Sequence, residues 1–132
     1  MAGILEKNDL AIIIPVLNCF WYTHQLISTL KVGFPHQLIL IDNGSTDQTK
    51  KYFRDLEDHG LAFVIFNKEN IGVAASWNLG IKTAIEKFNS RYFFIPNNDI
   101  LLHPKAIGIL LDTLKALKVA LVSAIDVSGQ GS

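Results

Sequence analysis

One stretch in the second half of the chain decides the fold: Tyr92-Phe93-Phe94-Ile95-Pro96-Asn97-Asn98-Asp99. Its first four residues are large, apolar and β-favouring, which predicts a strand buried on both faces of a parallel sheet. Helical features begin at Pro104, so the polar residues 97–99 lie where this strand ends and its loop begins. In open α/β sheets, ligands bind outside the carboxyl ends of the strands. This position therefore suits a carboxylate that holds a metal ion or a phosphate.

Five segments with the composition of strands alternate with four that have the spacing of helices. The strands are predicted at residues 10–14, where Pro15 ends the strand, and at 37–41, 61–66, 92–95 and 119–125. The helices are predicted at 19–30, 47–58, 73–88 and from Pro104 onward. Each crossover between parallel strands is right-handed and covers one face of the sheet. The order predicts an α/β fold, a Rossmann-like three-layer sandwich with a mostly parallel sheet, in which residues 1–132 form a single domain.

Local patterns refine the helices. Apolar residues at helical spacing predict one buried stripe along 73–88, made of Val73, Trp77, Ile81, Ala84 and Phe88. The helix from Pro104 is predicted to bury one face, made of Ile107, Leu110, Leu114 and Leu117. Ser45 or Thr46 precedes the helix at 47–58, and either hydroxyl can accept a hydrogen bond from its first free backbone N–H groups.

Composition excludes several classes of protein. The apolar fraction of 49% argues against disorder, and 12 basic and 12 acidic residues cancel, so no net field favours nucleic acid as a partner. The apolar runs fall short of the roughly 20 residues of a membrane-spanning helix, and residues 1–9 lack the apolar core of a signal peptide. The single cysteine, Cys19, excludes an internal disulfide and is expected to be a small core or loop residue. We expect a cytoplasmic protein without a transmembrane segment.

Polar clusters follow each of the first four predicted strands, at residues 15–18, 42–45, 67–70 and 97–99. Because the carboxyl ends of parallel strands lie along one edge of a sheet, these side chains are expected to converge. Asn, Asp and Gly are also ordinary turn formers, so a single loop of this kind carries little weight. Four coinciding clusters favour a binding site.

Common phosphate-binding and hydrolytic motifs are missing from the sequence. It has no Gly-x-Gly-x-x-Gly after the first strand, no Gly-Lys-Ser/Thr loop and no Gly-x-Ser-x-Gly elbow, which argues against dinucleotide enzymes, P-loop proteins and hydrolases. A sugar-nucleotide nucleotidyltransferase needs a glycine-rich loop with a basic residue after the first strand, and residues 15–22 offer neither. The amides and carboxylates that remain suit a base, a ribose and a metal-bound diphosphate.

Four segments together resemble the family 2 glycosyltransferases of GT-A fold. They are Ile12-Ile13-Ile14-Pro15-Val16-Leu17-Asn18, Ile41-Asp42-Asn43-Gly44-Ser45-Thr46-Asp47, Asn70-Ile71-Gly72-Val73-Ala74-Ala75-Ser76-Trp77-Asn78-Leu79-Gly80-Ile81 and Asn97-Asn98-Asp99, in the family's order. The second and fourth are most similar to the rhamnosyltransferase-like branch. The match covers nearly the whole chain but only the donor-binding half of a complete enzyme, which implies a truncated GT-A domain.

The resemblance implies an inverting transfer of a hexosyl or rhamnosyl group from a UDP-, dTDP- or GDP-linked sugar to a saccharide or other hydroxyl acceptor, with Mg²⁺ or Mn²⁺. It also implies the nucleotide-binding residues, which are Pro15, Val16 and Asn18 at the base and ribose, Asp42 or Asn43 at the base edge, Gly72 and Asn78 near the base or diphosphate, and Asn97 and Asn98. Asp99, with Asn97 as a further candidate ligand, stands at the family's Asp-x-Asp metal motif.

The chemistry of transfer supports these roles. A departing nucleoside diphosphate gains negative charge, which a divalent cation stabilises. Mg²⁺ keeps several waters and needs one or two carboxylates besides the phosphates, so Asp99 alone suffices. Two residues depart from the family's pattern: Asn43 stands where many relatives have a second aspartate, and Trp77 stands where many have arginine. Trp77 falls on the apolar stripe and is expected in the core.

The general base that inversion requires is not identified. Relatives supply it from a later acidic motif, and Asp126, the only carboxylate after the fifth predicted strand, comes too early to match it. Two hypotheses follow. The chain is an enzyme whose acceptor side comes from a partner, a second copy or further sequence, or it is a module that binds nucleotide sugar and metal without transfer. An open sheet edge at 119–125 also predicts a possible homo-oligomer.

Overall fold

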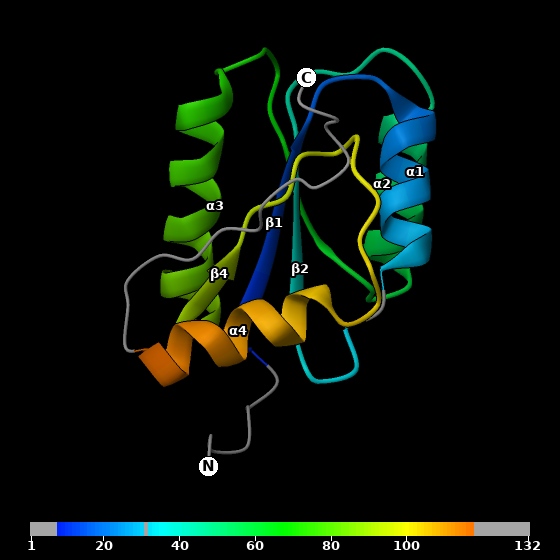
Figure 1. Ribbon diagram of the computed structural model, residues 1–132. Helices are drawn as coiled ribbons and strands as arrows, with labels where there is room; N and C mark the ends of the chain where they lie inside the picture. Colours follow the sequence, from blue (N-terminus) through cyan, green and yellow to red (C-terminus); the bar gives the residue numbers. More distant parts are fainter. Residues whose placement is uncertain (1–7, 31, 118–132) are drawn as a thin grey trace, which may run out of the picture.

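The computed structural model describes residues 8–30 and 32–117. Strands β1 (Leu10–Val16), β2 (Gln37–Asp42), β3 (Phe63–Phe66) and β4 (Tyr92–Phe94) alternate with helices α1 (Phe20–Thr29), α2 (Thr49–Asp58), α3 (Val73–Phe88) and α4 (Ala106–Leu117). All strand pairs are parallel, in the order β3-β2-β1-β4 (Figure 1). The predicted alternation is confirmed for this part of the chain. The predicted strand at 119–125 and Asp126 lie outside the described residues.

Helices cover both faces of the sheet. On one face, α1, α2 and α4 contribute Leu26, Phe53 and Ile107 to a core that includes alternate residues of β1 and β2. On the other face, α3 packs against the remaining residues of these strands (Figure 1). Because β1 and β2 are covered twice, their continuous apolar runs are buried except at Pro15, which is partly buried. No helix in the described ranges is long and apolar enough to cross a membrane.

Strand β1 continues through Pro15, contrary to the prediction that Pro15 ends it. The Val16 carbonyl accepts a hydrogen bond from the Asn43 N–H at 2.8 Å and so points towards β2. Backbone groups alternate along a strand, so those of Pro15 point away from β2, and β4 pairs with β1 only as far as Ile12. The missing N–H of Pro15 therefore costs no ladder hydrogen bond.

Helix α3 approaches the sheet through small residues. Ser76, Gly80 and Ala84, each four residues apart, are buried against β1 and β2. A Cβ atom at Gly80 would lie 2.4 Å from Ile13 Cγ2, which shows how close the helix backbone comes. The predicted stripe is therefore wrong at its beginning, because the close approach turns Val73 and Trp77 outward, where they are 60% and 38% exposed. Ala84 is buried, and Ile81 and Phe88 pack partly against the core as predicted.

Strand β4 and helix α4 differ from the prediction in burial. Phe93 is 36% exposed, because within the described ranges β4 pairs only with β1 and α3 lies over β1 and β2. The predicted burial of this strand on both faces is thus wrong. Helix α4 buries Ile107 and Leu111, whereas Leu117 is exposed at its end. The predicted face is shifted by a fraction of a turn.

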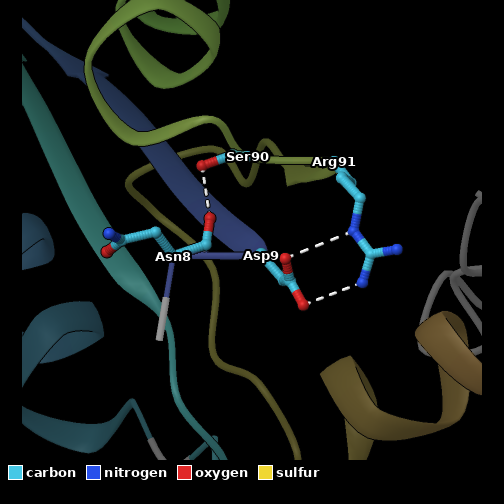
Figure 2. Close-up of polar contacts among 4 residues, drawn as sticks. All are labelled: Asn8, Asp9, Ser90 and Arg91. Carbon is cyan, nitrogen blue, oxygen red and sulfur yellow. Dashed lines mark hydrogen bonds and ion pairs between the residues drawn. The ribbon is translucent and has the colours of Figure 1, made fainter. Parts of the chain in front are cut away.

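A polar clamp closes the amino end of the sheet (Figure 2). The Arg91 guanidinium donates from Nη2 to Asp9 Oδ2 at 2.8 Å and from Nε to Asp9 Oδ1 at 3.2 Å. The Ser90 hydroxyl donates to the Asn8 carbonyl, and the N–H groups of Arg91 and Tyr92 both donate to the Asp9 carbonyl. Residues 8–9 and 90–91 directly precede β1 and β4, so the clamp joins the beginnings of these strands.

Candidate functional site

Three helices begin at the carboxyl edge of the sheet. Helices α1, α2 and α3 start at Phe20, Thr49 and Val73, each after a strand, and none has an acidic residue in its first turn. In Figure 1 the strands run upward, and α1 and α3 begin at the upper edge. Helix N-termini carry partial positive charge and free N–H groups. This edge therefore favours anions.

The loops after β1 and β2 are tied together by reciprocal hydrogen bonds. The Asn18 N–H donates to Ser45 Oγ at 2.7 Å, and the Thr46 N–H donates to Asn18 Oδ1 at 2.8 Å. Asn18 and Cys19 both have a φ of 57°, a left-handed conformation that is uncommon for residues with side chains. Cys19 is exposed in this loop. The bonds hold the polypeptide through a strained turn directly beside the strand ends.

Asp47 joins the beginnings of α1 and α2. Its Oδ2 accepts from the Phe20 N–H at 3.1 Å, and its Oδ1 accepts from the Thr49 N–H at 3.0 Å. Partial burial raises the pKa of the Asp47 carboxyl, but hydrogen bonds from Thr49 and Phe20 outweigh this effect and leave the pKa below its ordinary value. The predicted capping of α2 by Ser45 or Thr46 is wrong, because the Ser45 hydroxyl is used by Asn18 and α2 begins at Thr49.

Asp42 ends β2 as a fully buried carboxylate. Its Oδ1 accepts from the Ser45 N–H at 3.0 Å. Its Oδ2 is buried without a hydrogen-bond partner among the described residues. A buried carboxylate oxygen without a partner costs free energy, and such groups in native proteins call for an explanation. The free oxygen can accept a hydrogen bond from a ligand that reaches it.

Asn43 faces the other side of the sheet and joins three elements. Its Nδ2 donates to Ser76 Oγ at 2.8 Å, its Oδ1 accepts from Asn67 Nδ2 at 3.0 Å, and Ser76 Oγ donates to the Gly72 carbonyl at 2.6 Å. Gly72 has a φ of 88°, and its N–H donates to Asn70 Oδ1. This chain of bonds holds the beginning of α3 against the ends of β2 and β3.

The loop after β4 is connected to α1. Asn98 Nδ2 donates to Thr23 Oγ1 at 3.1 Å, and Thr23 is fully buried on α1. Asn97 and Asp99, on either side, are exposed. Within residues 8–30 and 32–117, no group of three or more His, Cys, Asp or Glu side chains could hold a metal ion. A cation at Asp99 would therefore take most of its ligands from a bound phosphate or from water.

The structure thus connects most of the predicted site residues through loops at one edge. Pro15 and Val16 end β1 beside Asn43, and Asn18, Asp42 and Asn43 belong to the hydrogen-bonded loops. Asn78 lies instead on the second turn of α3, where it lines a hollow of about 290 Å³ with Ile81, Lys82, Ile85 and Glu86.

Several residues of these networks were not predicted as site residues. They are Thr23, Ser45, Thr46, Asp47, Asn67, Asn70 and Ser76. The four-residue spacing of the small residues Ser76, Gly80 and Ala84 was the available signal for a close helix-to-sheet contact at Ser76.

Solved glycosyltransferase structures share this fold. Residues 1–349 of S. aureus TarS in complex with UDP-GlcNAc superpose with a TM-score of 0.68 at 16% identity, over 89% of this chain and 37% of that one. The mannosyltransferase PcManGT of Pyrobaculum calidifontis, in complex with GDP-Man and Mn²⁺, superposes with a TM-score of 0.67 at 17% identity, over 84% of this chain and 34% of that one. The α/β fold of the chain therefore matches that of GT-A glycosyltransferases.

Sequence comparison leads to the family. Uncharacterised glycosyltransferases of Rickettsia conorii and Rickettsia felis are each 30% identical to the chain over 100 residues, which is 74% of this chain. The chain spans 16% of the length of these curated relatives. The family model described as glycosyl transferase family 2 matches residues 11–132. Because this match covers nearly the whole sequence, the chain belongs to glycosyl transferase family 2.

Proposed function

We propose that residues 1–132 form one unit that binds the donor of a glycosyltransferase reaction, a nucleotide-diphosphate sugar, together with Mg²⁺ or Mn²⁺. The observation that carries the proposal is the buried Asp42 Oδ2, an acceptor without a partner in residues 8–30 and 32–117, at the carboxyl edge among loops held by hydrogen bonds. The family match supports it, as do the structural neighbours with UDP-GlcNAc and with GDP-Man and Mn²⁺.

In this proposal the two sides of the edge recognise different parts of the ligand. Asp42 accepts an N–H of the base, which requires a local movement that exposes its buried Oδ2. Asn43 shapes the base pocket indirectly, because its amide oxygen and one amide hydrogen are engaged by Asn67 and Ser76. Pro15, Val16 and Gly72 supply backbone around the base and ribose. Asn78, on the outer side of α3, has the weakest structural support of the predicted residues.

The diphosphate would lie near the positive ends of the helices, and the cation would lie at Asp99. An exposed carboxylate with neighbouring amides fits Mg²⁺ or Mn²⁺ when phosphate oxygens and water complete the ligand set. When bound, the cation stabilises the charge on the leaving diphosphate. Asn97 is the second candidate ligand. Asn98, which lies between Asn97 and Asp99, donates to Thr23 and so fixes this loop against α1.

The finer assignments remain part of the proposal. They are inversion at the sugar, a hexosyl or rhamnosyl donor as in the rhamnosyltransferase-like branch, a hydroxyl acceptor, and a cytoplasmic setting. Inversion needs a general base near the acceptor hydroxyl. The proposal assigns no residue of this chain to that role.

A thermal-unfolding panel tests donor binding. The protein is heated with UDP, dTDP, GDP or their sugar conjugates, each with and without Mn²⁺, and with AMP as a control. A ligand at about 100 times its dissociation constant stabilises the fold by roughly 2.7 kcal/mol. We expect one nucleoside diphosphate to raise the melting temperature, with a larger shift when Mn²⁺ is present. No shift with any member of the panel would refute the proposal.

The binding-module alternative predicts the same shifts but no chemistry. Chromatography that detects free sugar or a glycosylated product formed from the stabilising donor distinguishes the enzyme from the binding module. Turnover above the rate of a protein-free control supports the enzyme, whereas binding without any turnover supports the module.

A further inference from the structure

We propose that Asp47 is a positioning residue that fixes Asn18 so that the Asn18 amide donates hydrogen bonds to the oxygen atoms of the bound nucleotide. This inference rests on the proposed function, because it names how one strand-end loop is held ready for the donor. Asp47 itself lies one step away from the ligand and acts through the loop after β1.

The first observation is that the Asp47 carboxylate connects two elements. Oδ1 of Asp47 accepts from the N–H of Thr49, the first residue of α2, and that contact needs only one oxygen. The second oxygen accepts from the N–H of Phe20, 27 residues earlier and the first residue of α1. Phe20 comes two residues after Asn18, so this bond fixes the loop after β1 relative to α2.

The second observation is the strained backbone that this bond flanks. Asn18 and Cys19 are consecutive and both have a φ of 57°. A residue with a side chain in this conformation is strained and persists where surrounding contacts hold it. The Asn18 N–H donates to Ser45 Oγ, Asn18 Oδ1 accepts from the Thr46 N–H, and the Phe20 N–H donates to Asp47 Oδ2. Without the last of these contacts, the turn loses the hydrogen bond that ties the beginning of α1 to Asp47.

The third observation is the orientation of the Asn18 amide. Asn18 Oδ1 accepts from the Thr46 N–H at 2.8 Å, which assigns the oxygen to the protein side. Asn18 Nδ2 has no protein partner in the described ranges, and the residue is half-buried. The amide therefore offers donors only. The Asn18 amide can therefore donate to ribose or phosphate oxygens but cannot accept from the N–H groups of a base. In the proposed site, Asp42 accepts from those N–H groups.

The key variant is Asp47→Ser. A serine hydroxyl can still accept from the Thr49 N–H, because Ser and Asp are similarly favoured near helix N-termini, but its single oxygen cannot also accept from the Phe20 N–H. Asp55→Asn is the matched control, since Asp55 is an exposed α2 carboxylate paired with Lys51 on the helix surface. Asn18→Ala removes the amide. The probe is whichever of UDP, dTDP and GDP, with Mn²⁺, stabilises the parent most.

A double-mutant cycle, measured on the dissociation constant of the nucleotide, tests whether Asp47 acts through Asn18. Asp47→Ser and Asn18→Ala are each expected to weaken binding about five- to tenfold, as for one lost hydrogen bond. The double variant is expected to be no weaker than Asn18→Ala alone, because Asp47 acts through Asn18. Asp55→Asn is expected to bind as the parent does. The inference would be overturned if the two fold-losses in affinity multiply in the double variant, or if Asp47→Ser binds the nucleotide as tightly as the parent does.

Amide hydrogen exchange keeps this test separate from that of donor binding. In the nucleotide-free protein, Asp47→Ser is expected to speed exchange at Asn18, Phe20 and Thr46, and Asp55→Asn is expected to leave these rates unchanged. If no nucleotide binds the parent, the proposed function fails, whereas the exchange rates still show whether Asp47 holds the loop. Unchanged exchange at Asn18 and Thr46 in Asp47→Ser overturns the positioning role.

Discussion

The two ends of the sheet use polar residues in different ways. At the amino end, the Asp9 carboxylate pairs with Arg91 through both oxygens (Figure 2). At the carboxyl end, Asp42 uses one oxygen for the Ser45 N–H, and the other oxygen is buried without a partner among the described residues. At the amino end, Asn8 Oδ1 is also buried without a partner in the described part of the chain, but a neutral amide costs less to bury than a carboxylate.

This difference indicates that the polar residues of the amino end stabilise the fold, whereas those of the carboxyl end serve ligand binding. The clamp at the amino end satisfies its charges internally, so we expect it to contribute to folding and not to ligand affinity. The carboxyl end keeps an acceptor on Asp42 and a donor on Asn18, which leaves binding groups for a ligand at some cost in stability. Substitutions at the amino end are therefore expected to change the free energy of unfolding, and those at the carboxyl end the affinity for nucleotide.

Gly80→Ala is expected to destabilise the whole fold, because its Cβ would lie 2.4 Å from Ile13 Cγ2 and 3.1 Å from Ile41 Cδ1. Such overpacking costs about 1 to 3 kcal/mol in the free energy of unfolding, measured by urea denaturation. Gly108→Ala on α4 is the matched control, since its nearest atom is 3.7 Å away, and it should be stabilising by up to about 1 kcal/mol. Equal effects of the two substitutions would contradict the close packing of α3.

Asp42→Asn is expected to weaken binding of the preferred nucleoside diphosphate by about tenfold or more, because a charged acceptor is replaced by an amide. The free energy of unfolding should stay the same or rise, since the amide keeps an oxygen for Ser45 and removes a buried charge. Calorimetric titration and urea denaturation measure the two quantities. A large loss of stability with unchanged affinity would reverse the role assigned to Asp42.

Arg91→Ala is expected to do the opposite. It leaves the mostly buried carboxylate of Asp9 without its guanidinium, and we expect a loss of about 1 to 2 kcal/mol in the free energy of unfolding. The Arg91 side chain is 61% exposed, which places the loss towards the lower end. Nucleotide affinity of the folded variant should match the parent. A reduced affinity would show that the two ends are coupled.

Asp99→Ala is expected to have the smallest effect on the protein itself. Asp99 is exposed and belongs to a loop anchored by Asn98, so the unfolding temperature without ligand should not change. The additional shift that Mn²⁺ gives to the nucleotide-bound protein should disappear. Asp112→Ala, at an exposed position on α4, serves as the control. Equal Mn²⁺-dependent shifts in Asp99→Ala and the parent would remove Asp99 from the metal site.

Much of the fold was predictable from the sequence because β1 and β2 are buried on both faces and therefore read as continuous apolar runs. The alternation of strands and helices then determined a parallel sheet. The orientation of α3 was not predictable from apolar spacing, because the contact with the sheet is made by the small residues Ser76, Gly80 and Ala84. The exposure of Phe93 depends on strand order, which local sequence does not encode.

The meeting of the strand-end loops at one edge was predictable, whereas the hydrogen bonds within the candidate site were less so. Strand-end position was enough to bring Asn18, Asp42 and Asn43 to one edge. Which atom bonds to which depends on turns such as the left-handed pair at Asn18 and Cys19, whose conformation is imposed by the neighbouring loop. The bond from the Phe20 N–H to Asp47 joins residues that are 27 positions apart, so no local sequence pattern predicts it.

Paramagnetic broadening by Mn²⁺ in the nucleotide complex tests the central claim most directly. Amide NMR spectra of the protein, with the nucleoside diphosphate held constant, are recorded while Mn²⁺ replaces Mg²⁺. We predict selective loss of signals from residues 97–99 and from the loops after β1 and β2, with the signals of Asp9, Ser90 and Arg91 retained. Broadening centred on the amino end, or none above that seen with Mn²⁺ alone, would contradict a nucleotide and metal site at the carboxyl edge.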